Sequence, residues 1–188
     1  FCLILASSIH IFSPQIFWRT MAYLAVFHFI KQQYGLLKIY SRYEKNSKLK
    51  KFESFLIYLL TLYPVVHWHL NEKSFNWFKE NDFVFFKLPF LEIIMSYLYF
   101  LSIIIYCFWI FYLWRKKKIF NFPKLLLFLT TALVWYVGII SIDNDWSFTL
   151  TNVVNHGVPY LALIYLSTLQ GEYTGRTDGL TKLLSAGF

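Results

Sequence analysis

The feature that most limits the fold of this chain is a series of apolar runs, each long enough to cross a lipid bilayer. From Pro89 to Trp114, for example, Glu92 is the only charged residue. A helix rises about 1.5 Å per residue, so about 20 apolar residues span the roughly 30 Å of hydrocarbon. The sequence predicts five full spans, which are Gln15–Leu37, Phe52–Leu70, Pro89–Trp114, Pro123–Ile142 and Ser147–Leu169.

The composition favours the same setting. Hydrophobic residues make up 57% of the 188 residues and charged residues only 15%, a balance far from that of a soluble domain. We predict an all-α fold, a multi-pass transmembrane helical bundle over residues 1–170, followed by a polar tail over residues 171–188. The chain begins inside an apolar segment without an initiator Met. We interpret residues 1–12 as the end of a truncated helix and expect missing N-terminal helices of the same protein to pack against this chain.

The loops between the apolar runs differ in charge, and this difference predicts their orientation. Residues 38–51 contain six Lys or Arg against one Glu, and residues 115–124 contain five against none. The intervening loops, residues 71–82 and 143–145, are not basic. Because basic loops stay on the cytoplasmic side of a membrane, we place both basic loops and the C-terminal tail in the cytoplasm. This clustering accounts for the net charge of +8 without a nucleic-acid partner.

All five histidines lie within the predicted membrane segments or at their edges. An ionisable side chain at such a depth costs about 2.5–3.5 kcal/mol, so each one needs an explanation. His28, Lys31 and Tyr34 follow one another at i, i+3 and i+6 and lie near one another along one helix face. Lys31 is close enough to the inner end to reach the interface. His28 lies deeper, and we expect it to face the protein interior or water.

The last predicted span contains the most polar stretch, TNVVNHGVPY. Asn152, Asn155 and His156 fall at i, i+3 and i+4 and therefore share one face of a helix. Pro159 has no N–H to donate, and Gly157 allows another helix or a ligand to approach closely. Loosened backbone at membrane depth is tolerated where it is buried in protein or lines a cavity. We therefore expect this face to line the interior of the bundle.

The first functional hypothesis is a metal-dependent enzyme that acts on a lipid-soluble substrate within the membrane. Imidazole is the commonest metal ligand in proteins, so several histidines on neighbouring helices could hold Fe, Zn or Cu. His156 and His28 are the candidate catalytic residues, and Asn152 and Asn155 are candidate partners of the ligands. The candidate metal ligands are His28, His67, His69, His156 and Glu92, with His10 as a further choice.

Two other functions fit the same residues. A transporter or proton relay could use His28, His156, Lys31 and Tyr34 as a file of polar groups. Alternatively, the polar face only joins helices in a structural subunit. Motifs for other chemistry are missing from the sequence, which has no H-E-x-x-H zinc motif, no G-x-S-x-G nucleophile motif and no glycine-rich phosphate loop.

Overall fold

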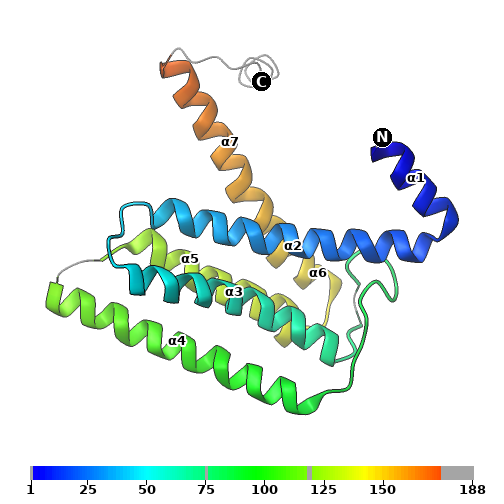
Figure 1. The fold of residues 1–188 in the computed structure, drawn as a ribbon, viewed down its shortest axis with the longest axis horizontal. Helices are drawn as coiled ribbons and strands as arrows, with labels where there is room; N and C mark the ends of the chain where they lie inside the picture. The colour runs from blue at the N-terminus through cyan, green and yellow to red at the C-terminus, as the bar shows by residue number, and fades with distance from the viewer. Residues whose placement is uncertain (1, 75, 118–119, 175–188) are drawn as a thin grey trace.

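The computed structural model describes residues 2–74, 76–117 and 120–174, and these residues form helices without any strand (Figure 1). The prediction of an all-helical fold is confirmed. The predicted polar tail, residues 171–188, falls outside the described residues from residue 175 onward. The helical segments, with π-helical turns labelled η, are α1 (Cys2–Phe12), α2 (Pro14–Tyr40), α3 (Ser47–Leu70), α4 (Pro89–Lys117), α5 (Phe122–Trp135), η1 (Tyr136–Ser141), α6 (Asp145–Phe148), η2 (Thr149–Val154) and α7 (Asn155–Thr174).

Several helices begin at a polar residue that caps their first backbone N–H groups. The side-chain oxygens of Ser13, Asn46 and Asn121 each accept a hydrogen bond from the backbone N–H three residues later, at 3.4, 3.1 and 3.1 Å. Proline follows near the first position of α2 and of α5, where its missing N–H removes no helical hydrogen bond. These caps define where α2, α3 and α5 begin.

Helices α2, α3, α4 and α5 lie side by side, and α3 packs against the other three (Figure 1). Burial of apolar side chains between these helices holds the bundle together. The larger core cluster consists of Leu36, Leu37, Leu56, Ile57, Leu59, Leu60, Tyr63, Tyr99, Tyr106, Leu127 and Phe128. The smaller cluster consists of Val26, Ile30, Val65, Trp68, Trp135, Ile139 and Phe148.

The described residues of the two basic segments lie at the same end of the bundle (Figure 1). The connection between α2 and α3 approaches the start of α5, where Asn121 Nδ2 donates a hydrogen bond to the carbonyl of Tyr40 at 3.1 Å. At the opposite end, the residues after α3 approach the residues after η1. There the backbone N–H of Ser74 donates to Asp143 Oδ1 at 2.8 Å. The alternation of basic and non-basic loops along the sequence thus corresponds to the two ends of the bundle.

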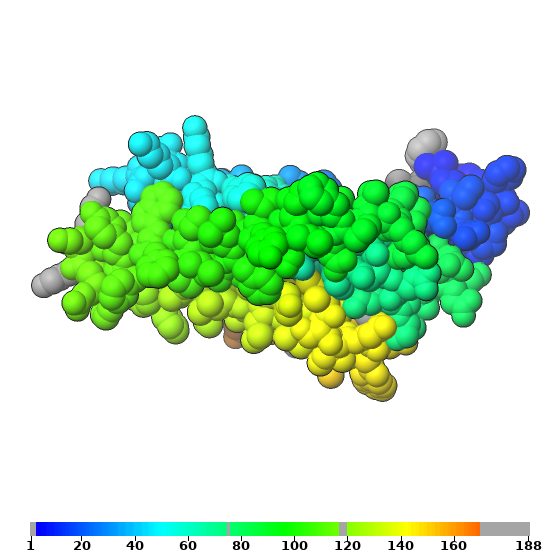
Figure 2. All heavy atoms as spheres, turned by 90° about the horizontal axis from the view of Figure 1, so that it is seen from below, coloured from blue at the N-terminus to red at the C-terminus, as the bar shows by residue number. Residues whose placement is uncertain are grey.

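Two stretches of the described residues are long and apolar enough to cross a membrane, Pro89–Lys116 and Phe122–Ser141. The first is most of α4, and only 17% of its most apolar part is buried, so most of its side chains face outward. Figure 2 shows α4 running along one face of the molecule. Exposed side chains on α4 include Phe90, Tyr97 and Phe108. An exposed apolar face of this length is typical of a surface that contacts lipid or another protein.

The predicted bundle of five spans is not confirmed. Helices α2 and α3 cover two predicted spans, but neither is among the stretches that are long and apolar enough to cross a membrane. The last predicted span, Ser147–Leu169, is divided among α6, η2 and α7, and α7 leaves the bundle at a steep angle (Figure 1). A π-helical turn and Pro159 both interrupt the regular hydrogen bonding of this segment. A straight span antiparallel to α5 is therefore not formed.

Candidate functional site

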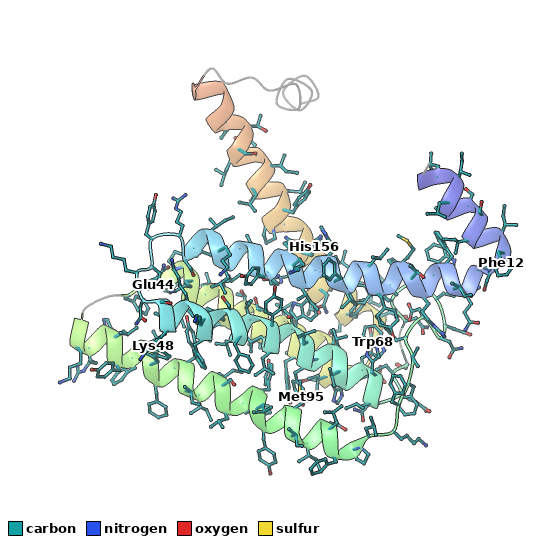
Figure 3. The ribbon with its side chains drawn as sticks, viewed as in Figure 1. Phe12, Glu44, Lys48, Trp68, Met95 and His156 are labelled. Carbon is teal, nitrogen blue, oxygen red and sulfur yellow. The ribbon has the colours of Figure 1, made fainter. Side chains whose placement is uncertain are left out.

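The junction between α2 and α7 brings together two histidines that are far apart in the sequence. The imidazole rings of His28 and His156 meet edge to face, with centroids 5.1 Å apart. The ring of Phe29 stacks on His156 at 3.9 Å. Gln32 Nε2 donates a hydrogen bond to the backbone carbonyl of His156 at 2.9 Å. His156 therefore lies where α7 crosses α2 (Figure 3), and its backbone and its ring both contact α2.

The backbone before His156 is held by a close contact between the two π-helical turns. A Cβ atom added to Gly138 of η1 would collide with the side chain of Thr151 and would lie 2.6 Å from Asn152 Nδ2. Glycine is therefore required at position 138 if η2 is to approach η1 this closely. By contrast, nothing lies within 4 Å of a Cβ added to Gly157. The close approach predicted at Gly157 occurs instead at Gly138. π-Helical turns are rare and are frequent at functional sites.

One polar atom on each of α2, η2 and α7 is buried without a hydrogen-bond partner among the described residues, namely Gln32 Oε1, Asn152 Oδ1 and His156 Nδ1. Asn152 is only 3% exposed, and its Nδ2 donates to the carbonyl of Phe148 at 3.3 Å. A buried polar atom without a partner costs free energy, and most such atoms in proteins are bonded. These atoms are therefore available to a proton, a water molecule or a ligand.

The predicted interior face is only partly formed. Asn152 is buried, and Asn155 and His156 are half-buried, as expected for this face. His28, however, is an exposed residue of α2 rather than an interior one. It meets His156 because α7 crosses α2 instead of running within the bundle (Figure 3). The ring of His28 therefore contacts His156, but His28 is not an interior residue of the bundle.

The histidines near the end of α3 form two separate pairs. His67 Nδ1 lies 2.9 Å from Glu92 Oε1 at the start of α4, and Asn71 Nδ2 donates to the same oxygen at 3.1 Å. His69 points elsewhere, because residues two apart on a helix lie on different sides. Its Nε2 is 2.9 Å from the hydroxyl of Tyr23. His67 and Glu92, two of the candidate metal ligands, therefore contact each other, but His69 does not join them.

The candidate metal ligands do not gather in one place. Among the residues that the structure describes, no three His, Cys, Asp or Glu side chains lie close enough to hold one metal ion. His28 meets His156, His67 meets Glu92, and His69 meets a tyrosine. His10 packs against the rings of Phe17 and Trp18 on α2. The residues present in this part of the chain therefore do not assemble the single Fe, Zn or Cu site that the sequence suggested.

Lys31 and Tyr34 belong to the contact between α2 and α3. Lys31 Nζ donates a hydrogen bond to the hydroxyl of Tyr58 at 3.2 Å, and the ring of Tyr34 stacks on that of Tyr58 at 5.0 Å. Within the described residues, no hydrogen bond joins Lys31 or Tyr34 to His28 or His156. The continuous polar file suggested by their spacing is therefore interrupted after His28.

At the end opposite to the basic loops, Lys73 connects the residues after α3 to η1. Lys73 Nζ donates to the carbonyl of Ile140 at 3.3 Å. Burial lowers the pKa of Lys73, while the nearby carboxylates of Asp143 and Glu92 act in the opposite direction. This lysine therefore stabilises the packing of the loop against η1 and lies apart from the histidine pair.

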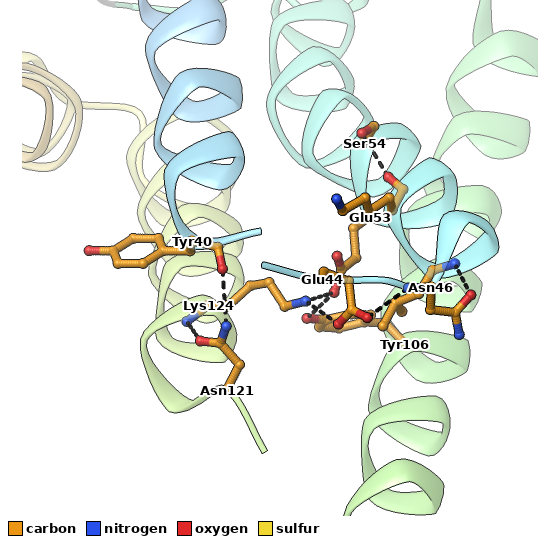
Figure 4. A network of polar contacts seen from close by, with 10 residues as sticks. Tyr40, Glu44, Asn46, Glu53, Ser54, Tyr106, Asn121 and Lys124 are labelled. Atoms are coloured by element: carbon orange, nitrogen blue, oxygen red, sulfur yellow. Dashed lines mark hydrogen bonds and ion pairs between the residues drawn. The ribbon is translucent and has the colours of Figure 1, made fainter. Parts of the chain in front are cut away.

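A buried ion pair at the basic end was not found by reasoning from the sequence (Figure 4). Lys124 Nζ lies 2.6 Å from Glu53 Oε1 and 3.6 Å from Glu44 Oε2. The hydroxyl of Tyr106 donates to Glu53 Oε1 at 3.5 Å. Glu53 and Lys124 are 0% and 2% exposed, respectively. The cluster therefore joins α3, α4, α5 and the connection between α2 and α3.

Lys124, the last residue of the predicted basic loop 115–124, lies in the first turn of α5. Lys124 belongs to α5 and is buried, because its ammonium group is paired with the Glu53 carboxylate inside the bundle. The available signal was weak. Glu53 is an acid within a basic stretch beside an apolar run, and Lys124 follows Pro123 at the start of another. Two opposite charges at the same end of neighbouring helices can be matched only when the helix neighbours are known.

Comparison of the chain with protein-family models, with curated proteins and with solved structures found no match.

Proposed function

We propose that this chain is an integral membrane protein in which His28 and His156 form a proton-transfer site within the membrane. The observation that carries this proposal is the direct contact between the two imidazole rings, whose centroids are 5.1 Å apart. Imidazole is the side chain that gains and loses a proton near neutral pH. Because each ring has two nitrogens, a proton accepted by one ring can pass through a bridging water molecule to the other ring, which releases a proton from its second nitrogen.

Buried polar atoms on the segments that carry or adjoin the two rings suit this role. His156 Nδ1 is buried without a partner among the described residues, so no hydrogen bond there fixes which nitrogen carries the proton. Gln32 Oε1 and Asn152 Oδ1 are buried acceptors that can bind a protonated group or water. Gln32 also holds the backbone of His156 through its Nε2, which keeps the second ring beside the first.

A metal-dependent reaction on a lipid-soluble substrate is the second candidate. The two imidazoles and the amide oxygens of Gln32 and Asn152 are nitrogen and oxygen donors of the kind that Fe, Zn and Cu accept. However, no third His, Cys, Asp or Glu joins the pair within the described residues.

Metal analysis of the purified chain separates the candidates. Stoichiometric metal that is lost in His156→Gln supports the enzyme, whereas proton flux without metal supports proton transfer.

The expected orientation is multi-pass, with residues 38–51, residues 115–124 and the C-terminal tail in the cytoplasm. Support comes from the apolar lengths of α4 and of α5 with η1, and from the common end of the basic segments.

Ser47 and Asn144 are exposed and lie at opposite ends. With Cys2 and Cys107 replaced by Ser, a cysteine at position 47 or 144 should react with an impermeant maleimide from opposite sides of intact vesicles. Reaction of both from one side would refute this orientation.

His156→Gln should reduce proton flux to about a tenth or less, because an amide cannot carry the proton that imidazole exchanges. The flux is measured with a pH-sensitive dye in liposomes that contain the purified chain and an imposed pH difference. The protein should still fold, because Gln32 bonds the backbone carbonyl of residue 156 and not its ring.

The matched control is His10→Gln, which makes the same chemical change at an exposed histidine of α1. Its flux should equal that of the unmodified chain. If both variants lose flux equally, or if neither loses it, the His28–His156 pair is not the route of the proton.

A further inference from the structure

A small cavity lies between the end of α2 and the start of α3, at the basic end of the bundle. Its volume is about 120 Å³. It is lined by Leu37, Lys38, Ser41, Arg42, Lys50 and Ser54. We propose that this cavity is a binding site for a phosphate-bearing anion, separate from the histidine pair.

The lining carries three positive charges and no negative one. Among the described residues, no carboxylate lies within ion-pair distance of Lys38, Arg42 or Lys50. The two nearest acids in the sequence, Glu44 and Glu53, instead bind Lys124 at 3.6 and 2.6 Å. Both carboxylates are therefore paired with the buried lysine of α5, and neither lines the cavity. An anion that enters it meets cationic groups without an internal counter-ion.

Two serines complete the lining, and they differ in their bonding. Ser54 Oγ donates to the carbonyl of Lys50 at 2.8 Å and accepts from Lys38 Nζ at 3.3 Å, so it holds Lys38 beside the cavity. Ser41 is only 5% exposed, and its Oγ has no hydrogen-bond partner within the described residues. A buried hydroxyl without a partner is costly, and an anion oxygen is the acceptor that this hydroxyl lacks.

The size of the cavity restricts the ligand. A volume of about 120 Å³ corresponds to roughly four water molecules at about 30 Å³ each. That space accepts a group of the size of one phosphate. The Arg42 guanidinium can bind two oxygens of a phosphate, and a lysine ammonium can bind a third. The phosphate can come from free inorganic phosphate or from the headgroup of an anionic phospholipid, which the cytoplasmic leaflet supplies.

The test measures binding to the purified full chain in a zwitterionic detergent by isothermal titration calorimetry. Sodium phosphate and dioleoyl phosphatidic acid are the two probes, and dioleoyl phosphatidylcholine is the lipid control. The double variant Arg42→Gln/Lys50→Gln should weaken binding at least about tenfold, because it removes two charge-assisted contacts. The matched control Lys45→Gln/Lys48→Gln removes two exposed charges from the same basic segment and should change binding less than about twofold.

A second variant, Ser41→Ala, tests the cavity without changing its charge. It should weaken binding about threefold, because it removes one hydrogen-bond donor to the anion. It should not lower the unfolding midpoint of the free protein, because the hydroxyl has no partner there.

Binding of both probes would identify a phosphate site of general use, and binding of phosphatidic acid alone would identify a lipid-headgroup site. Both results support the proposal. It is overturned if neither probe binds, if the lipid control binds equally well, or if the two double variants lose affinity equally.

Discussion

Replacement of Lys124 by Met is expected to lower the free energy of unfolding by about 3–5 kcal/mol, the cost of removing one partner from a buried ion pair. The change leaves the Glu53 carboxylate inside the bundle, 0% exposed, without the ammonium group 2.6 Å away. The remaining donor, the hydroxyl of Tyr106 at 3.5 Å, is too long and too weak to compensate. Unfolding is measured in mixed micelles by the loss of helical circular dichroism as sodium dodecyl sulfate is added.

Two controls separate the pairing from loss of a positive charge. Lys48→Met removes an exposed lysine at the same end of the bundle (Figure 3) and should change stability by less than about 0.5 kcal/mol. The double variant Glu53→Gln/Lys124→Met should recover much of the loss, because no unpaired charge remains buried. If Lys124→Met unfolds like Lys48→Met, the ion pair is not formed in the folded protein.

Gly138→Ala is expected to destabilise the protein by about 1–3 kcal/mol, the usual cost of overpacking a tight contact. The new methyl group would collide with Thr151 and lie 2.6 Å from Asn152 Nδ2, so η1 and η2 would have to separate. Because η2 leads directly into His156, the same variant should also reduce proton flux in liposomes. Both losses are measured with the assays described above.

Gly157→Ala and Gly35→Ala are the matched controls for this substitution. Nothing lies within 4 Å of a Cβ at either position, and both lie within helices. Alanine in a helix is favoured over glycine by about 0.5–1 kcal/mol. The controls should therefore be as stable as the parent chain or more stable. A Gly138→Ala protein as stable as these controls would show that the two π-helical turns are not in contact.

Much of the secondary structure could be predicted from apolar length and helix-start residues. The expected spans Gln15–Leu37 and Pro89–Trp114 correspond to α2 and α4 within a few residues. The last segment could not be predicted, because apolar length does not reveal a π-helical turn or the direction in which α7 leaves the bundle. The difference between the predicted span Ser147–Leu169 and the observed segment therefore begins at η2.

The candidate site was predicted in part for a related reason. The cost of polar groups at membrane depth indicated His156 and Asn152 as candidates, because that cost depends on residue type and position along a segment. Their partners depend on which helices are neighbours. The contact of Gln32 with the backbone of His156, and of Glu53 with Lys124, joins residues that no spacing rule relates.

The crossing of α7 over α2 has a mechanical consequence. Past this crossing, α7 leaves the bundle (Figure 1), and its exposed side chains there include Leu161, Tyr165 and Leu166. Two positively charged rings 5.1 Å apart would repel each other by roughly 3 kcal/mol at an effective dielectric constant of about 20. The repulsion would act where α7 crosses α2. The charge on the two rings and the tilt of α7 relative to α2 would therefore be thermodynamically linked. A force that tilts α7 would, by the same linkage, change how readily the rings hold a second proton.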